Sequence, residues 1–298
     1  MEKISTESNI PQDRGTRKIA EIQSRRTHWD SFLIVAAFHI LAVVALFYFS
    51  WQNLAVLLVV NYLAESLGLG VGFHRLLTHR SFKTPKWLEY VLTTLGTLSV
   101  QSGATKWVTT HRLHHKHTET DDDPHTPRHG TIWSHIGWIF RGTAQEHDEE
   151  TLKRYVPDLL KSKFHVWLSR HYYVSSIALG LILLAAGGWS MVLWGVFLRT
   201  VFGWHSTWLV NSASHLWGTR RFETKDDSTN NGLIAIFSFG EGWHNNHHAH
   251  PTSARHGLKW YEFDMNWMAI RLFKALGWAK QIRVYKLKKA DLPLNADA

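Results

Sequence analysis

The chain has 298 residues, enough for one large domain or two small ones. It contains no cysteine, which excludes disulfides, iron–sulfur clusters, zinc sites built on thiolates and a thiol nucleophile. Lys and Arg number 33 against 24 Asp and Glu, for a formal net charge of +9, and the counts of 21 His and 16 Trp are far above ordinary usage.

A polar leader over residues 1–30 lacks the apolar segment and small-residue cleavage site of a signal peptide. Its basic residues are Lys3, Arg14, Arg17, Lys18, Arg25 and Arg26. Residues 31–64 then contain no charged side chain, and the apolar sequence pauses at Trp51-Gln52-Asn53 before continuing to residue 73. Because a bilayer core of roughly 30 Å needs about 20 apolar residues per helix, we predict a transmembrane hairpin, hairpin one, over residues 31–73.

Residues 74–165 are more polar, and we expect them to form a cytoplasmic segment. Within it, the stretch "PKWLEYVLTTLGTLSVQ" places apolar residues along one face of a helix, which its tryptophan suggests lies in the membrane interface. A third span is the competing interpretation, and it would put the histidine clusters described below on opposite sides of the membrane.

Residues 171–198 again lack charged side chains and contain a turn signal at residues 187–190. They predict hairpin two over residues 166–212, followed by a cytoplasmic tail over 213–298. In the tail, "WMAIRLFKALGWAKQIRVYKL" is a basic amphipathic helix that lies either on an anionic membrane surface or against the cytoplasmic domain. The expected fold is therefore an all-α membrane protein with four transmembrane helices in two hairpins and a cytoplasmic helical cap. Two buried helical hairpins of a soluble protein are the alternative.

Basic residues set the expected orientation. They precede the first span, whereas the short turns between the predicted spans carry no Lys or Arg. The positive-inside bias then puts both termini and the segment between the hairpins on the cytoplasmic side of a multi-pass inner-membrane protein.

Three histidine clusters recur along the cytoplasmic parts. The first is "HRLLTH" at residues 74–79, the second is "HRLHH" at 111–115, and the third is "HNNHH" at 244–248. The second and third share the spacing i, i+3, i+4, which places three imidazoles on one helical face. The first has the spacing i, i+5, which an ideal helix would splay by roughly 140°, so we expect the helix to end or kink between His74 and His79.

The number of imidazoles indicates more than one metal. The clusters supply eight histidines, and His215 is a ninth, four residues after Asn211 at the end of the last predicted span. A tetrahedral zinc takes only four ligands, so nine suit two metals with open positions. Nitrogen donors alone permit iron, copper, nickel or zinc. The remaining histidines, such as His39 in an apolar span, stay unassigned.

Taken together, these motifs resemble those of the membrane fatty-acyl desaturases. The three clusters, in this order around two hairpins, are closest to the stearoyl-CoA desaturase type and its bacterial acyl-lipid and acyl-CoA relatives. "NSASHLWG", "DDDPH" and "SHIGW" are similar to the same branch. The resemblance covers roughly residues 30–280, and the three clusters with the Asn-x-x-x-His element are specific only in combination.

The resemblance implies two irons held by nine histidines. By motif position, one iron takes His74, His79, His111, His115 and His248. The other takes His114, His215, His244 and His247, with Asn211 through a water. Glu119, Asp123 and Glu241 are candidates to orient imidazoles, with solvated charge as the alternative reading.

The resemblance also implies the reaction. A cis double bond, at the ninth carbon, would be formed in a saturated long-chain acyl group with dioxygen and two external electrons. We expect a separate electron donor of ferredoxin or cytochrome type, a bilayer and an acyl-CoA or acyl-lipid substrate, and no nucleic acid. The head group stays open, and Tyr62 is a candidate to limit chain length. Aromatic residues such as Trp107, Trp133, Trp138, Phe140, Trp204, Trp208 and Trp243 are tunnel or interface candidates.

Two other functions use the same features. A membrane di-iron hydroxylase needs the same ligands and would give an alcohol rather than an alkene. A histidine-lined metal transporter needs ligands at membrane depth, whereas nearly all of these histidines follow the predicted spans.

Overall fold

The computed structural model describes residues 27–141, 147–288 and 291. These residues form helices and connecting loops, with three isolated β-bridges and no strand among them. Most of the leader predicted over 1–30 lies outside the described residues, which begin at Thr27.

Among the described residues, three helices are long and apolar enough to cross a membrane: Trp29–Tyr48, Trp51–Thr78 and Tyr173–His215. The first consists of α2 (Trp29–Ala45) and η1 (Leu46–Tyr48), and the second of α3 (Trp51–Asn61) and the π-helix η2 (Tyr62–Thr78). The third runs through α10 (Tyr173–Val192), η5 (Leu193–Leu198), α11 (Arg199–Ser212) and η6 (Ala213–His215). In its described residues the chain is therefore all-helical, with three helices that fit a membrane protein.

The first two of these helices are joined by a tight turn. Phe49 and Ser50 are extended, and the Ser50 hydroxyl accepts a hydrogen bond from the backbone N–H of Asn53 at 3.0 Å, which caps α3. The turn was predicted at Trp51-Gln52-Asn53, but these residues form the first turn of α3. The serine cap, rather than the polar pair that follows it, marks the helix start.

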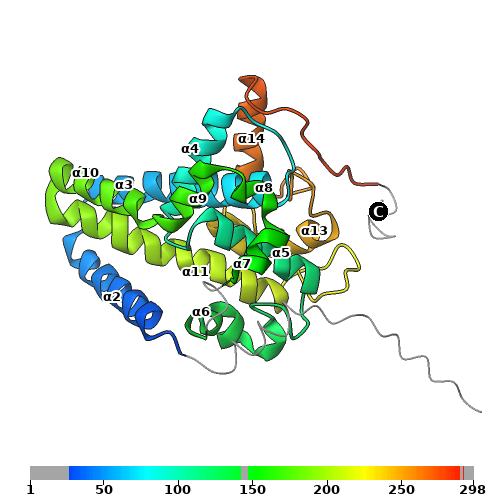
Figure 1. Ribbon diagram of the computed structural model, residues 1–298, viewed down its shortest axis with the longest axis horizontal. Helices are drawn as coiled ribbons and strands as arrows, with labels where there is room; N and C mark the ends of the chain where they lie inside the picture. The colour runs from blue at the N-terminus through cyan, green and yellow to red at the C-terminus, as the bar shows by residue number, and fades with distance from the viewer. Residues whose placement is uncertain (1–26, 142–146, 289–290, 292–298) are drawn as a thin grey trace, which may run out of the picture.

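The 43-residue helix reverses direction in its middle. Gly187 (φ −156°) and Gly188 (φ +71°) interrupt the helical backbone, and a positive φ suits glycine because it has no Cβ. Beyond the reversal, Val192 and Val196 pack against Leu183 in one buried cluster, so the two halves lie against each other. Figure 1 shows α10 and α11 running side by side, with α2 on the side of α11 that faces away from α10.

The predicted interfacial helix is α4 (Lys86–Thr97), whose twelve residues are too few to cross a bilayer. It packs against η2 without side chains between the backbones: a Cβ at Gly68 would lie 2.3 Å from the Gly96 nitrogen. The helix therefore does not form the third span of the competing interpretation.

The amphipathic stretch near the C-terminus is helical only over α14 (Met265–Ala275). Its Ala269, Ile270 and Phe273 belong to the main hydrophobic core with Val71 of η2. This supports the interpretation that the helix packs on the protein, and Figure 1 places it next to α4.

Shorter helices complete the part of the chain that holds the histidines. They are α5 (Ala104–His117), η3 (Pro127–His129), η4 (Trp133–Gly137), α6 (Trp138–Phe140), α7 (Glu149–Tyr155), α8 (Pro157–Leu160), α9 (Lys163–Arg170), α12 (Gly232–Phe237) and α13 (His244–Ala249).

Candidate metal centre

Nine histidines from four elements converge in two groups. The five-histidine group consists of His74, His79, His111, His115 and His247. The four-histidine group consists of His114, His215, His244 and His248. Within each group, one nitrogen from every ring lies within 4.8 Å of the others, which is the spacing expected around a single ion. All nine candidate histidines from the sequence are thus brought together.

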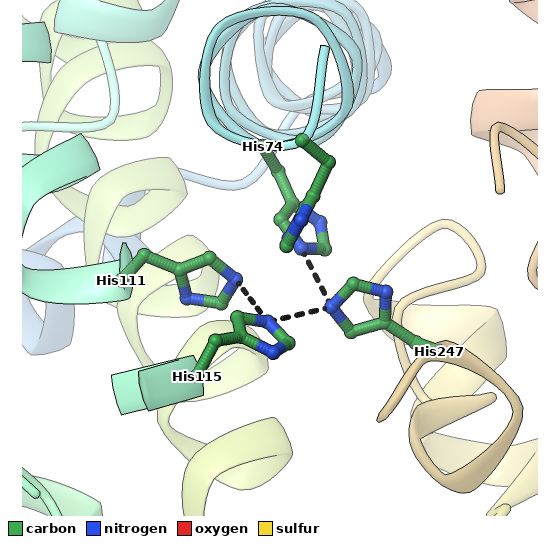
Figure 2. Close-up of side chains that lie close together, drawn as sticks. His74, His111, His115 and His247 are labelled. Atoms are coloured by element: carbon green, nitrogen blue, oxygen red, sulfur yellow. Dashed lines mark hydrogen bonds between the residues drawn. The ribbon is translucent and has the colours of Figure 1, made fainter. Parts of the chain in front are cut away.

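The five-histidine group is held by η2, α5 and α13. The Nε2 atom of His247 lies 3.1 Å from Nε2 of His74 and 2.9 Å from Nε2 of His115, which in turn lies 3.1 Å from Nε2 of His111. Figure 2 shows these four rings pointing toward one another, His111 and His115 from α5, His74 from η2 and His247 from α13.

The π-helix explains how the spacing of the first cluster is accommodated. The backbone N–H of His79 donates to the carbonyl of His74 at 3.1 Å, an i→i+5 bond, and the two rings are 4.8 Å apart. The helix was expected to end or kink between these residues: η2 does end there, at Thr78, but its π-helical turns bring the two rings together without a kink. The wider turn of a π-helix stacks residues five apart, and such turns are frequent at functional sites.

The division of the third cluster between the groups differs from the expectation. His247 belongs to the five-histidine group and His248 to the four-histidine group, the reverse of the assignment by motif position. The physical reason is helical geometry: residues four apart differ by about 40° around the axis, and residues three apart by about 60° in the other sense. His244 and His248 therefore stay together, as His111 and His115 do on α5.

In four of these histidines, the ring nitrogen that faces away from the group, Nδ1, contacts a carboxylate. Glu241 lies 2.8 Å from Nδ1 of His74, Asp123 lies 3.0 Å from that of His114, Glu119 lies 2.9 Å from that of His215, and Asp226 lies 2.8 Å from that of His248. Such contacts fix the tautomer and orientation of ligating histidines. Glu119, Asp123 and Glu241, the candidates from the sequence, thus contact imidazoles, and their orienting role stays a prediction, whereas the contact of Asp226 was not predicted.

Protonation states follow from these contacts. Burial alone would raise the pKa of Asp123, but the neighbouring His114 and His125 hold it well below its usual range, so the carboxylate stays ionised. Burial, reinforced by neighbouring imidazoles, places the pKa values of His111, His115 and His247 well below the ordinary value. These rings are therefore neutral, the form that binds metal.

The donor set of the four-histidine group fits a cation. Nδ1–H of His114 and of His248 each donates a hydrogen bond to a carboxylate, and in a neutral ring this tautomer leaves a lone pair on Nε2. These two Nε2 atoms lie 3.4 Å apart, where neither can donate to the other. A metal ion between them removes the repulsion, so the residues present match a metal centre.

One more buried histidine, unassigned from the sequence, adjoins the five-histidine group. Nδ1 of His256 lies 3.1 Å from Oε2 of Glu241, the same oxygen that contacts His74, and its ring packs against His247. Arg75 is fully buried and pairs with Glu241 at 3.0 Å. Glu241 thus joins a metal-facing histidine to a buried ion-pair network.

His39, left unassigned from the sequence, lies outside both groups and is part of a different arrangement. Its Nδ1 lies 2.7 Å from the Val35 carbonyl and its Nε2 lies 3.1 Å from His205, whose other nitrogen lies 3.0 Å from His135. Because one nitrogen of His205 contacts His39 and the other contacts His135, the three rings lie in a row and do not surround a common point.

Two cavities reach the histidine groups from the side of α2 and α11. The larger, about 360 Å³, extends from Asp30 and Lys106 to His111. The smaller, about 60 Å³, lies between η2 and α11 and is lined by His74 and His244. Asn211 lines both, which places it beside the metal-facing rings.

The aromatic candidates divide accordingly. Trp107, Trp138, Trp204 and Trp208 line the larger cavity, whereas Trp133, Phe140 and Trp243 are not among its lining residues. Tyr62 lines neither cavity and packs against Phe239 instead, so it has no contact that supports the expected role in limiting chain length.

Comparison with known proteins identifies the family. Residues 49–278 match the sequence profile of the fatty acid desaturase family. The chain is 45% identical over 260 residues to the sn-2 palmitoyl-lipid 9-desaturase of Nostoc sp. (strain 36), covering 87% of this chain and 91% of that protein. It is 45% identical over 273 residues to the sn-1 stearoyl-lipid 9-desaturase of Anabaena variabilis, covering 91% and 99%.

A relative that is named for a different acyl substrate is also similar to this chain. The acyl-CoA C20 Delta5-desaturase of Anemone leveillei is 39% identical over 284 residues, covering 93% of this chain and 89% of that protein. The similarity therefore extends across desaturases that are named for different acyl carriers and double-bond positions. The chain belongs to the fatty acid desaturase family and is a membrane-bound acyl desaturase.

Proposed function

We propose that the chain inserts a cis double bond at the ninth carbon of a saturated acyl chain carried by a membrane lipid. The relatives of Nostoc and Anabaena variabilis, both named as lipid 9-desaturases, support this position and carrier. The observation that carries the proposal is that one cavity runs from Asp30 and Lys106 to His111 and Asn211, so an acyl chain in it would pass beside the histidine groups.

The proposed cofactor is a pair of irons. The five-histidine group would hold one iron and the four-histidine group the other, with Asn211 acting through a water. The all-nitrogen donor set and the opposed lone pairs of His114 and His248 support two cations here. When bound, an iron pair supplies the oxidising power from dioxygen that breaking an unactivated C–H bond needs.

The chain's own residues supply position. A methylene group has no polar handle, so the walls of the cavity must fix which carbons lie at the centre. Val35, Trp204 and Trp208 form one such wall as a packed cluster. The buried carboxylates hold the imidazoles in place through Nδ1, and burial of His244 and His247 keeps bulk water from the reacting carbons.

The proposed membrane topology has four spans in two hairpins over residues 31–73 and 166–212. The reversal at Gly187 and Gly188 supports two crossings within the long third helix. Both termini, the segment over 74–165 and the tail over 213–298 would lie in the cytoplasm, following the distribution of basic residues.

The electron donor would be a separate protein of ferredoxin or cytochrome type. Two electrons per double bond must come from outside the chain, and the net charge of +9 favours an acidic carrier.

Expression in a host that lacks acyl desaturases tests the proposal. Gas chromatography and mass spectrometry of fatty acids from separated lipid classes should show a new cis-9 monounsaturated chain in glycerolipids. The His111→Ala variant should show none. Hydroxylated chains, or a double bond at another carbon, would contradict the proposal.

A further inference from the structure

A third pocket lies on another side of the five-histidine group. Its volume is about 520 Å³, and two members of the group, His79 and His115, form part of its wall. The two cavities on the acyl side are lined by other members, His74 and His111, and share no lining residue with this pocket. The five-histidine group is thus reached from two separate sides.

The pocket is basic. Its eight lining residues are Thr78, His79, Arg80, Arg112, His115, Pro251, Thr252 and Arg283, with no acid among them. Asp158, outside the lining, pairs with Arg80 at 2.7 Å and with Arg112 at 3.2 Å, so one carboxylate is shared by two of the three arginines that line the pocket. The remaining positive charge gives the pocket an attraction for a negatively charged partner.

The rim of the pocket is built from two distant segments pinned together. The backbone N–H of Arg283 donates to Ser81 at 2.8 Å, and Lys83 and Lys280 exchange backbone hydrogen bonds of 2.8 and 2.9 Å. These contacts hold the exposed side chains of Lys83, Lys280 and Arg283 beside the exposed Arg80. The basic surface is therefore a fixed feature of the fold and extends beyond the pocket itself.

We propose that this basic pocket, with its rim of Arg80, Lys83, Lys280 and Arg283, docks an acidic one-electron carrier protein that delivers electrons through His79 and His115. The inference rests on the proposed function, in which the five-histidine group holds iron. It goes further by assigning a surface and an entry side. Among the described cavities, this is the one that brings rings of the metal centre to a basic surface without passing the acyl side.

The requirement for such a partner follows from the balance of the reaction. Two hydrogens leave the acyl chain, and one dioxygen becomes two waters with two further protons and two electrons. A one-electron carrier must therefore dock twice per double bond, and two reduced carriers are oxidised. Entry on the far side from the substrate lets the carrier exchange while the acyl chain stays bound. A lipid head group does not fit this role, because the pocket is separate from the acyl cavities.

Charge reversal at the exposed arginines tests the proposal. Arg112 is left unchanged, because it also donates to the backbone carbonyl of Leu77 at 2.7 Å. The variants are the double substitutions Arg80→Glu with Arg283→Glu and Arg80→Gln with Arg283→Gln. Lys163→Glu, at an exposed lysine on α9, is the matched control. The probe is a plant-type [2Fe–2S] ferredoxin, added to the purified, iron-loaded enzyme.

Three measurements are needed: ferredoxin binding by surface plasmon resonance, the anaerobic rate of iron reduction by ferredoxin, and the same rate with dithionite. The double Glu variant should weaken ferredoxin binding and slow reduction by ferredoxin at least about tenfold at low salt, with a smaller loss near 0.15 M salt because screening shortens electrostatic reach. The Gln variant should lie between, and the control should match the wild type. Reduction by dithionite should stay within about twofold of wild type in all of them.

The proposal would be overturned if the wild type and the double Glu variant bound ferredoxin equally well, or if neither bound it. An equal loss with dithionite would also overturn it, because the arginines would then act on the metal centre itself. The proposed function fails separately, if the dithionite-reduced wild type forms no double bond when given dioxygen and acyl-lipid.

Discussion

The Nε2 atoms of His114 and His248 lie 3.4 Å apart, while the Nδ1 atom of each ring bonds an aspartate. Both Nε2 atoms then present lone pairs to each other inside a buried group. Removal of metal should therefore cost stability as well as activity. A ligand at a thousandfold excess over its dissociation constant stabilises a protein by about 4.1 kcal/mol. Chelation should lower the unfolding temperature in detergent, and restored iron should raise it again. An unchanged unfolding temperature would contradict a metal in this group.

Removal of a single metal-facing ring should abolish desaturation. His111→Ala, His215→Ala and His247→Ala each leave one proposed ligand position empty, and we expect no detectable product with reduced iron content. His39→Ala is the control, because His39 contacts Val35 and His205 outside both groups. Fatty-acid analysis and iron content measure both effects. Near-normal product from His247→Ala would refute the assignment of that ring.

The neighbouring acids Asp226 and Asp227 allow a matched test of imidazole orientation. Asp226 bonds Nδ1 of His248 at 2.8 Å, whereas the side chain of Asp227 is 57% exposed and faces arginines. Asp226→Asn should lower iron affinity or activity by about 10- to 100-fold, as loss of such a partner typically does. Asp227→Asn should change iron affinity and activity by less than about twofold. Equal effects of the two substitutions would show that Asp226 has no special role.

The reversal within the third long helix depends on Gly188. Its backbone angles, φ +71° and ψ −166°, lie in a region that essentially only glycine adopts, so Gly188→Ala should destabilise the protein by about 1–3 kcal/mol and lower the unfolding temperature. Gly180→Ala is the matched control. Its Cβ would lie 3.9 Å from Val196, an ordinary contact, and a helical alanine should be about 0.5–1 kcal/mol more favourable than glycine. Thermal unfolding of the two variants should therefore shift in opposite directions.

The sequence predicts the metal-facing histidines because their spacing is local. The i, i+3, i+4 pattern of His111, His114 and His115 is visible in five residues, and the structure brings these rings together. Long apolar runs identify the candidate membrane helices for the same reason. Gly187 and Gly188 also lie within the predicted turn, because glycine and a polar neighbour mark a reversal directly.

What the sequence does not predict depends on contacts between distant segments. Asp226 bonds a ring 22 residues away, and nothing local distinguishes it from Asp227. His256 follows the third cluster in the sequence but lies outside its i, i+3, i+4 pattern, and only the fold shows that its ring packs on His247. The π-helix that brings His79 edge to face with His74 has no simple residue signature, so the sequence indicated the helix end but not the π-helical turn before it. Likewise, only the packed structure shows that Tyr62 lies away from both acyl-side cavities.

Crystallography at the iron absorption edge would test the central claim most directly. An anomalous difference map of the iron-loaded protein should contain two iron peaks per chain, one within the five-histidine group and one within the four-histidine group, with His247 at the first and His248 at the second. A single peak, or a folded and active protein without iron in either group, would contradict the two-iron centre on which the proposed function depends.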